Sequence, residues 1–246
     1  MPATWEPSFN FYLSRIDEEP VSIVLDLNAQ TLPSHPVRLQ IRVPLRVPRA
    51  DGLRDSSELE AMGRIEDQVV DSLTPAFDAV FVGRYVMAGS TVFIFYLPES
   101  AKAETCLEVI GSMAPYEAQW LTKSDPPWSF FHNFLYPNPY AFQSMLSRSL
   151  VQQLQTAGDA LVSARPIDHL ALFDDRAVAD QASTHLAAKG FSMEPVAPHE
   201  GGGFELAFRR DDEVTDAHPD VFVGEILDVI LPIGGRYDGW GCPVVK

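Results

Sequence analysis

The chain has little cysteine and no long apolar run, and each shortage excludes a class of protein. Its 246 residues contain two cysteines, Cys106 and Cys242, which lie too far apart for a CxxC metal motif or a disulfide framework. No apolar run approaches the roughly 20 residues of a membrane-spanning helix. The first 20 residues carry neither the basic nor the apolar region of a signal peptide. We therefore expect a cytoplasmic protein with reduced thiols and no membrane partner.

Basic residues are also scarce. The chain has 18 lysine and arginine residues against 34 aspartate and glutamate residues, which gives a net charge of −16. Residues 1–137 carry 10 basic and 18 acidic side chains, and residues 138–246 carry 8 and 16, so each part contributes −8. Such a surface repels nucleic acid in most orientations, and we expect no direct nucleic-acid binding. The charge favours solubility or a partner protein with a basic face.

The common catalytic signatures are missing as well. Gly201-Gly202-Gly203 precedes Phe204-Glu205 instead of the Gly-Lys-Ser/Thr of a phosphate-binding loop, and no GxSxG, HExxH or EF-hand pattern occurs. The six histidines include no pair at i and i+4 that would share a metal ion. Cys106 lies on an apolar helix stripe, which predicts a buried structural thiol. We predict no catalytic, cofactor-binding or metal-binding residue, and we expect that the chain is not an enzyme.

What the sequence does contain is regular apolar alternation. The runs Phe9–Leu13 and Val21–Leu27 predict an opening β-hairpin, and Val37–Val47 predicts a strand with one face on the core. Two further strands follow, and the second of them is apolar on both faces, as expected of a central strand covered on both sides. These two strands are predicted at Ala79–Met87 and Thr91–Leu97.

Helices are predicted between these strands. A capping box of Asp55 and Glu58 opens the first helix, and we expect Pro75 to end it. The order strand-helix-strand-strand-helix-strand begins at residue 37 and recurs between residues 167 and 245. We therefore predict an α+β fold of two tandem ferredoxin-like (β-α-β-β-α-β) domains, the first preceded by the hairpin.

Between the two predicted domains lies a segment rich in proline and aromatic residues, residues 123–142. So many aromatic side chains would not remain in water, so we interpret the segment as an ordered crossover packed between the domains. Asn138-Pro139 then begins a linker helix that Gly158 ends. The predicted division is a first domain, a linker with its helix, and a second domain, at residues 1–135, 136–158 and 159–246.

Two groups of polar residues are candidate sites. Arg38, Arg42 and Arg46 share one face of the third strand, which predicts either a stripe for an anionic ligand or an exposed face paired with local carboxylates. Asp168 and His169 lie on the strand that is expected to pair with the last strand.

The second group has two interpretations. With Tyr237 and Asp238 on the neighbouring strand, Asp168 and His169 form a possible acid–base cluster. The alternative is structural: Asp168 pairs with Arg165, and His169 satisfies a hydrogen bond at a strand edge.

A glycine- and aromatic-rich stretch near the C-terminus carries a family resemblance. Gly234-Gly235-Arg236-Tyr237-Asp238-Gly239-Trp240-Gly241 resembles the C-terminal signature of the regulator of ribonuclease E activity B family. An upstream pattern also resembles that family: it consists of Arg165, Asp168, His169 and Phe173, followed by Gly190-Phe191. The resemblance implies a ferredoxin-like α+β fold and a protein that lowers ribonuclease E cleavage by contact, without catalysis. It makes Arg165, Asp168, His169, Tyr237, Asp238, Gly239 and Trp240 a candidate interaction or structural signature.

Residues 1–135 resemble an uncharacterised bacterial family, domain of unknown function 695. The resemblance rests on Trp5 with the hairpin after it, Gly52-Leu53 before a helix, Ile65-Glu66-Asp67 and the aromatic strand that ends in Phe95-Tyr96. It implies no activity.

Four hypotheses follow. The first is a non-catalytic regulator that acts by protein–protein contact, with a ribonuclease as the partner that the resemblance implies. The second is a small-molecule or anion-binding protein, and the third is an immunity-like antitoxin that masks a basic partner. The fourth is an enzyme that uses Asp168, His169 and Asp238. The oligomeric state stays open, because the apolar face with Val92 and Ile94 needs cover from the other domain, the crossover or a second chain.

Overall fold

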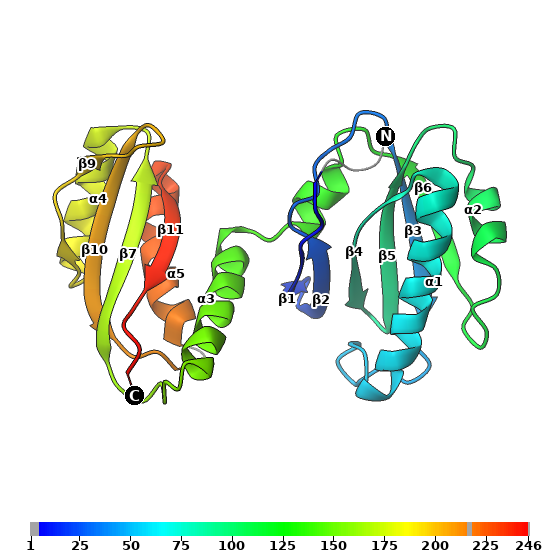
Figure 1. The fold of residues 1–246 in the computed structure, drawn as a ribbon, viewed down its shortest axis with the longest axis horizontal. Coiled ribbons are helices and arrows are strands. Elements are labelled where there is room, and N and C mark those ends of the chain that lie inside the picture. Colours follow the sequence, from blue (N-terminus) through cyan, green and yellow to red (C-terminus); the bar gives the residue numbers. More distant parts are fainter. Residues whose placement is uncertain (1–4, 216–217, 246) are drawn as a thin grey trace. The chain divides into compact units, whose positions relative to one another are not determined.

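The chain forms two compact units, Met1–Pro137 and Asn138–Lys246, each a mixed α+β structure built on one antiparallel sheet (Figure 1). The computed structural model describes residues 5–215 and 218–245. The expected element order, strand-helix-strand-strand-helix-strand, is present in both units, and β9 adds a short strand to the second.

The first unit contains a six-stranded sheet in the order β1-β2-β4-β5-β3-β6. Its strands are β1 (Phe9–Ile16), β2 (Glu19–Asp26), β3 (Val37–Pro44), β4 (Val80–Met87), β5 (Ser90–Leu97) and β6 (Gln119–Ser124). Its helices are the 3-10 turn η1 (Ser56–Glu58), α1 (Leu59–Phe77), α2 (Ala103–Ile110) and the π-helical turn η2 (Phe131–Leu135). The predicted hairpin is confirmed as β1 and β2, which pair from Phe9 opposite Asp26 to Ile16 opposite Glu19.

The helix-covered face of the first sheet forms the larger core of this unit. Met62, Ile65, Val69 and Leu73 repeat along α1 at helical spacing, and all four are buried. They belong to one cluster with alternate residues of β3 and β5: Leu39, Ile41, Val43, Phe93, Phe95 and Leu97. All eight residues of β5 are buried, which confirms the prediction of a central strand covered on both sides.

The aromatic crossover covers the opposite face of the same sheet. The Trp128 ring stacks on the Tyr96 ring with centroids 4.0 Å apart, and its Nε1 donates to the backbone oxygen of His35 at 2.8 Å. Asp125 accepts hydrogen bonds from the Tyr96 hydroxyl at 2.7 Å and from two backbone amides of the crossover. The crossover is therefore ordered, as predicted, and the apolar face of β5 takes its cover from the crossover of its own unit.

Two predictions about α1 are also wrong. Asp55 caps the η1 turn by accepting from Ser57 N at 2.9 Å, but Glu58 does not complete a capping box. Its carboxylate is buried, where it accepts from the Val47 amide and the Tyr116 hydroxyl. Pro75 lies inside α1, which continues to Phe77, because a proline in the last turn removes only one intrahelical hydrogen bond.

The second unit contains a sheet in the order β11-β7-β10-β8, with β9 also paired to β10. Its strands are β7 (Arg165–Phe173), β8 (Ser192–Met193), β9 (Ala197–Pro198), β10 (Phe204–Asp212) and β11 (Arg236–Gly241). Its helices are α3 (Pro139–Thr156), α4 (Arg176–Ala188), α5 (His218–Ile230) and the 3-10 turn η3 (Leu231–Ile233). Strand β8 is only two residues long, and Pro195, two residues after it, has no amide to donate to β10.

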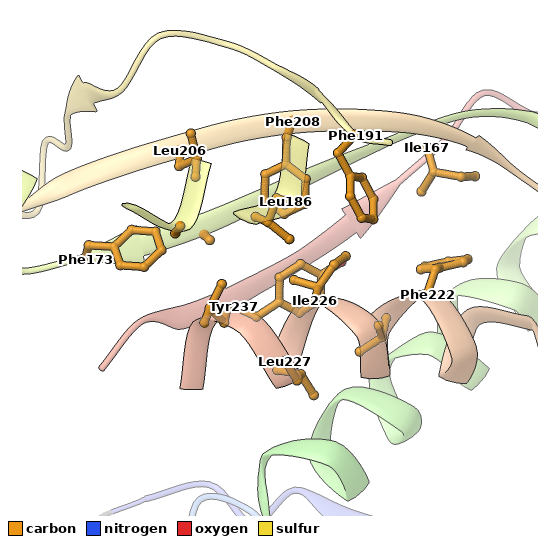
Figure 2. Close-up of a cluster of buried hydrophobic side chains, with 14 of the residues drawn as sticks. Ile167, Phe173, Leu186, Phe191, Leu206, Phe208, Phe222, Ile226, Leu227 and Tyr237 are labelled. Atoms are coloured by element: carbon orange, nitrogen blue, oxygen red, sulfur yellow. The ribbon is translucent and has the colours of Figure 1, made fainter. Parts of the chain in front are cut away.

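Helices α4 and α5 pack on one face of this sheet, and the other face has no helix on it (Figure 1). The core lies between them, with Phe173, Leu206 and Phe208 from the strands and Leu186, Phe222 and Ile226 from the helices (Figure 2). Asn138 caps α3 by accepting from Ala141 N at 2.9 Å, as predicted. However, α3 belongs to the second unit and contacts α5 and β11, so it is not a separate linker helix.

Candidate functional site

Strands β7 and β11 bring most of the signature residues together. They pair antiparallel, with Trp240 opposite His169 and Gly241 opposite Asp168. The register shifts between Tyr237 and Gly239, so β11 contains a bulge between these two residues. Alternation along β7 sends odd-numbered side chains towards the helices and even-numbered ones to the open face. The site therefore has an inner and an outer part.

His169 forms the centre of the inner part. Its side chain is buried, and Nδ1 lies 2.8 Å from the Tyr237 hydroxyl. Three phenylalanine rings surround the imidazole with centroids 5.2–5.5 Å away, those of Phe191, Phe208 and Phe222. Burial lowers the pKa of His169 to about 3 and raises that of Tyr237 well above its ordinary value, so both are neutral at pH 7. The neutral pair of His169 and Tyr237 therefore has a structural role in the core.

Arg165 pairs with a residue that sequence reasoning missed. Its guanidinium makes two hydrogen bonds to the buried Asp159 carboxylate, one of them from Nη2 at 3.0 Å. Asp159 also accepts from the amides of Leu161 and Val245, both at 2.8 Å. The hydrogen bonds from Arg165 are the largest cause of the depressed pKa of Asp159. This cluster fastens the C-terminal segment to the loop before β7.

The outer part contains Asp168 and Asp238, which are both exposed. Asp168 accepts from Arg209 Nε at 2.9 Å on the neighbouring strand, and the two side chains are 62% and 59% exposed. The predicted structural pairing of Arg165 with Asp168 is therefore wrong, because the two residues lie on opposite faces of β7. The acid–base cluster fails for the same reason, since His169 points inward.

A shallow hollow of about 360 Å³ lies on this open face. Its lining includes Asp168, Leu170, Ala207 and Asp238. Gly239, at the bulge, has φ +134°, a conformation that favours glycine, and no atom lies within 4 Å of the position a Cβ would take. The hollow thus combines two half-buried apolar residues, Leu170 and Ala207, with the exposed carboxylates of Asp168 and Asp238.

Helix α3 holds β11 in place behind the hollow. Trp240 Nε1 donates to Ser147 Oγ at 2.9 Å, and the Trp240 ring meets the Phe222 ring edge-on at 5.4 Å. Gln143 Nε2 donates to the backbone oxygen of Tyr237 at 3.0 Å. Gln143 and Ser147 are spaced by four residues on the buried side of α3, and these polar positions were the signal that sequence reasoning overlooked.

The predicted anion stripe in the first unit is not continuous. Arg38 is 8% exposed, with its guanidinium 4.2 Å from the centre of the Phe130 ring of the crossover. Arg42 is exposed and donates from Nε to Ser90 Oγ at 3.0 Å. Arg46 lies beyond the end of β3. The crossover therefore covers Arg38, the first residue of the predicted stripe.

Two searches over residues 5–215 and 218–245 gave negative results. No group of three or more histidine, cysteine, aspartate or glutamate side chains there could hold a metal ion. None of the helices described there is long and apolar enough to cross a membrane.

Comparison with solved structures gives little information. "Crystal Structure of an Unknown Protein from Galdieria sulphuraria" is 11% identical, with 85% of this chain and 99% of that chain covered and a TM-score of 0.22. "Crystal structure of putative glycine cleavage system transcriptional repressor" is 8% identical, with 84% and 98% covered and a TM-score of 0.23. No curated protein matches the chain.

Comparison with protein families is more informative. Residues 7–136 match the family of unknown function DUF695, and residues 145–242 match the family described as regulator of ribonuclease activity B. The division between the two matches falls in the same part of the chain as the division between the two compact units. Both resemblances noted in the sequence are confirmed. The chain belongs to the DUF695 family, and its second unit is similar to the regulators of ribonuclease activity B.

Proposed function

We propose that this chain is a non-catalytic, cytoplasmic regulator that binds a ribonuclease through the open face of the second sheet. The family match of residues 145–242 supports a regulatory role. The separation of the signature into two faces supports the choice of surface. His169, Tyr237 and Arg165 are buried in structural contacts, whereas Asp168 and Asp238 are exposed.

The observation that carries the proposal is the hollow between Asp168 and Asp238. Exposed carboxylates beside a patch of apolar sheet suit a partner with basic and apolar side chains. A face of sheet without helices also offers a flat, rigid surface, because β7 lies between two hydrogen-bonded neighbours, β10 and β11.

The strand orders support a more specific assignment of the fold. We propose that each unit is a ferredoxin-like domain, the first up to residue 137 and the second from residue 138. Numbered within each unit and without the hairpin and β9, the orders β6-β3-β5-β4 and β11-β7-β10-β8 both become 4-1-3-2. In a fold of this kind both long helices lie on the same face of the sheet.

The test measures cleavage of a labelled RNA by ribonuclease E from the source organism, with and without the purified full chain. We expect wild-type chain to slow cleavage. Asp168→Lys and Asp238→Lys should weaken this inhibition by about tenfold each, because each places a cation where the partner presents cations. Both positions are exposed, so the variants should fold normally.

Asp180→Lys is the matched control. Asp180 is 57% exposed and lies 3.8 Å from Arg176, so it is an exposed carboxylate beside an arginine as Asp168 is, but it is on α4, which packs on the other face of the sheet. It should inhibit as well as wild type. Unchanged cleavage at saturating wild-type chain contradicts the ribonuclease assignment. Equal loss in Asp180→Lys and Asp168→Lys contradicts the choice of surface.

A further inference from the structure

The β1–β2 hairpin forms one end of the first sheet. β1 is the outermost strand of that sheet. On its inner side Tyr12 is buried and donates to the backbone oxygen of Leu135 at 2.8 Å. On its other side Phe11 and Leu13 are 48% and 51% exposed. Large apolar side chains exposed in a row on one strand indicate a surface that binds something.

These side chains form the floor of a groove of about 800 Å³. Its opposite wall consists of the first residue of α1, Leu59, which is 58% exposed, and the loop of residues 49–54. The groove thus has exposed apolar side chains on its floor, from Phe11 and Leu13, and in its wall, from Leu59.

The loop wall is rigid. Arg49 N donates to Leu53 O at 2.9 Å, and Gly89 N, in the β4–β5 turn, donates to Gly52 O at 2.8 Å. Gly52 has φ +75°, and a Cβ there would lie 3.2 Å from the backbone of Ala88. Because the loop is pinned against the neighbouring turn, the groove exists before any ligand arrives.

The groove is basic in a chain of net charge −16. Its lining includes three arginines, Arg15, Arg49 and Arg54, and one acidic residue, Asp51. Arg49 is paired with Asp51 at 2.6 Å, but no described residue forms an ion pair or side-chain hydrogen bond with Arg54. Burial and the nearby Arg84 lower the pKa of Arg54, and the nearby carboxylates of Glu66 and Glu58 offset part of this effect. Because its guanidinium has no hydrogen-bonded carboxylate among the described residues, it can pair with a carboxylate of a ligand.

The outer edge of β1 is also open. No other strand in the described part of the chain pairs with it. Exposed edge strands usually carry proline, lysine or a bulge that prevents further pairing, yet the eight residues FNFYLSRI contain no proline and no lysine, and they pair with β2 without a register shift. Such an edge is a template for an added strand.

We propose that an extended, acidic and apolar segment of a partner polypeptide adds to β1 as a further strand. Its alternate apolar side chains would contact Phe11 and Leu13, and its carboxylates would pair with Arg15 and Arg54. A second copy of the chain fits less well, because it would bring the same arginines to a groove that already holds them. This surface lies in the first unit and does not depend on the proposed function of the second.

The test uses a fluorescein-labelled peptide of about ten residues, the length of a long strand, that alternates valine or phenylalanine with aspartate or glutamate. Fluorescence anisotropy with the full chain should show saturable binding that weakens as salt rises. Binding should fall by at least about tenfold for a peptide with lysine in place of the acidic residues, and likewise for one Nα-methylated at every second residue, which cannot pair as a strand.

Variants of the chain locate the site. Leu13→Glu, Arg15→Gln and Arg54→Gln should each weaken peptide binding about fivefold or more. Arg15 is exposed, so its variant keeps the test valid if Arg54→Gln does not fold. The matched controls are Val162→Glu, at a side chain 80% exposed, and Arg64→Gln, at one 69% exposed, and both should bind like wild type.

Three results would overturn the proposal. One is the absence of saturable binding by the wild-type chain. Another is equal binding of the methylated and unmethylated peptides. The third is a dimer in sedimentation velocity experiments that Leu13→Glu abolishes, which would make a second copy the occupant. None of these depends on ribonuclease activity, so failure here is distinct from failure of the proposed function.

Discussion

The Tyr237 hydroxyl lies 2.8 Å from Nδ1 of His169, in the interior of the second unit. When the hydroxyl donates to Nδ1, the neutral imidazole carries its proton on Nε2. Nε2 is buried and has no hydrogen-bond partner among the described residues. The family signature thus contains a neutral, half-satisfied polar pair within an aromatic core, and this pair links β7 to β11.

Replacing Tyr237 by phenylalanine should therefore destabilise the protein. The variant keeps the ring but leaves the buried imidazole of His169 without a hydrogen-bond partner, which lowers the free energy of unfolding by about 1–3 kcal/mol. Urea unfolding followed by tryptophan fluorescence measures the free energy of unfolding. Tyr140→Phe is the control, because the Tyr140 hydroxyl donates to Asp228 at 2.7 Å on an exposed surface and its loss should change stability by less than about 0.5 kcal/mol. Equal effects of the two variants would contradict this role for the pair.

His169 should also make stability depend on pH. Its pKa is about 3 in the folded protein against an ordinary value of 6.5, because burial disfavours the charged form. Between these values the unfolded chain binds a proton that the folded protein does not. The contribution of His169 is therefore fully present above pH 6.5 and is lost as the pH falls towards 3, by up to about 1.4 kcal/mol per pH unit.

The contribution of His169 to the pH dependence of stability can be isolated with the variant His169→Phe. The free energy of unfolding of wild type minus that of the variant, measured from pH 7 to pH 4.5, should decrease as the pH falls, because only wild type loses stability through this residue. The imidazole proton resonances of His169 should in addition stay unshifted down to pH 5 in the folded protein. Parallel stability curves, or a His169 titration near pH 6, would contradict the assignment.

Several features of the fold could be predicted from local sequence. The hairpin, the central strand β5 and the N-cap of α3 at Asn138 each depend on residues close together in the chain. Polar partners could not be predicted in this way. Arg165 bonds to Asp159 in the loop before β7, where Val245 of the C-terminal segment donates to the same carboxylate, and no local sequence pattern marks that contact. Charge and spacing pointed instead to Asp168, which strand alternation places on the opposite face.

The Arg165–Asp159 pair provides a test of that correction. Its two side chains are 2% and 0% exposed, so removing one partner leaves a buried charge uncompensated. Arg165→Met should cost about 3–5 kcal/mol in the free energy of unfolding, and the double variant Arg165→Met/Asp159→Leu should recover a large part of it. Asp168→Leu, which removes only an exposed pair, should cost less than about 1 kcal/mol. A double variant no more stable than Arg165→Met would contradict the pairing as the source of the cost.

Glycine 235 in the signature should be required for packing. A Cβ at Gly235 would lie 2.4 Å from Cε1 of the buried Phe173 ring and 3.1 Å from Cβ of Ile230. Gly235→Ala should therefore cost about 1–3 kcal/mol through overpacking. Gly224→Ala is the matched control, because Gly224 lies inside α5 with no atom within 4 Å of a Cβ position, and alanine there should stabilise the protein by about 0.5–1 kcal/mol. Thermal unfolding of the two variants should thus shift in opposite directions, and a shift in the same direction would show that Gly235 is not held against Phe173.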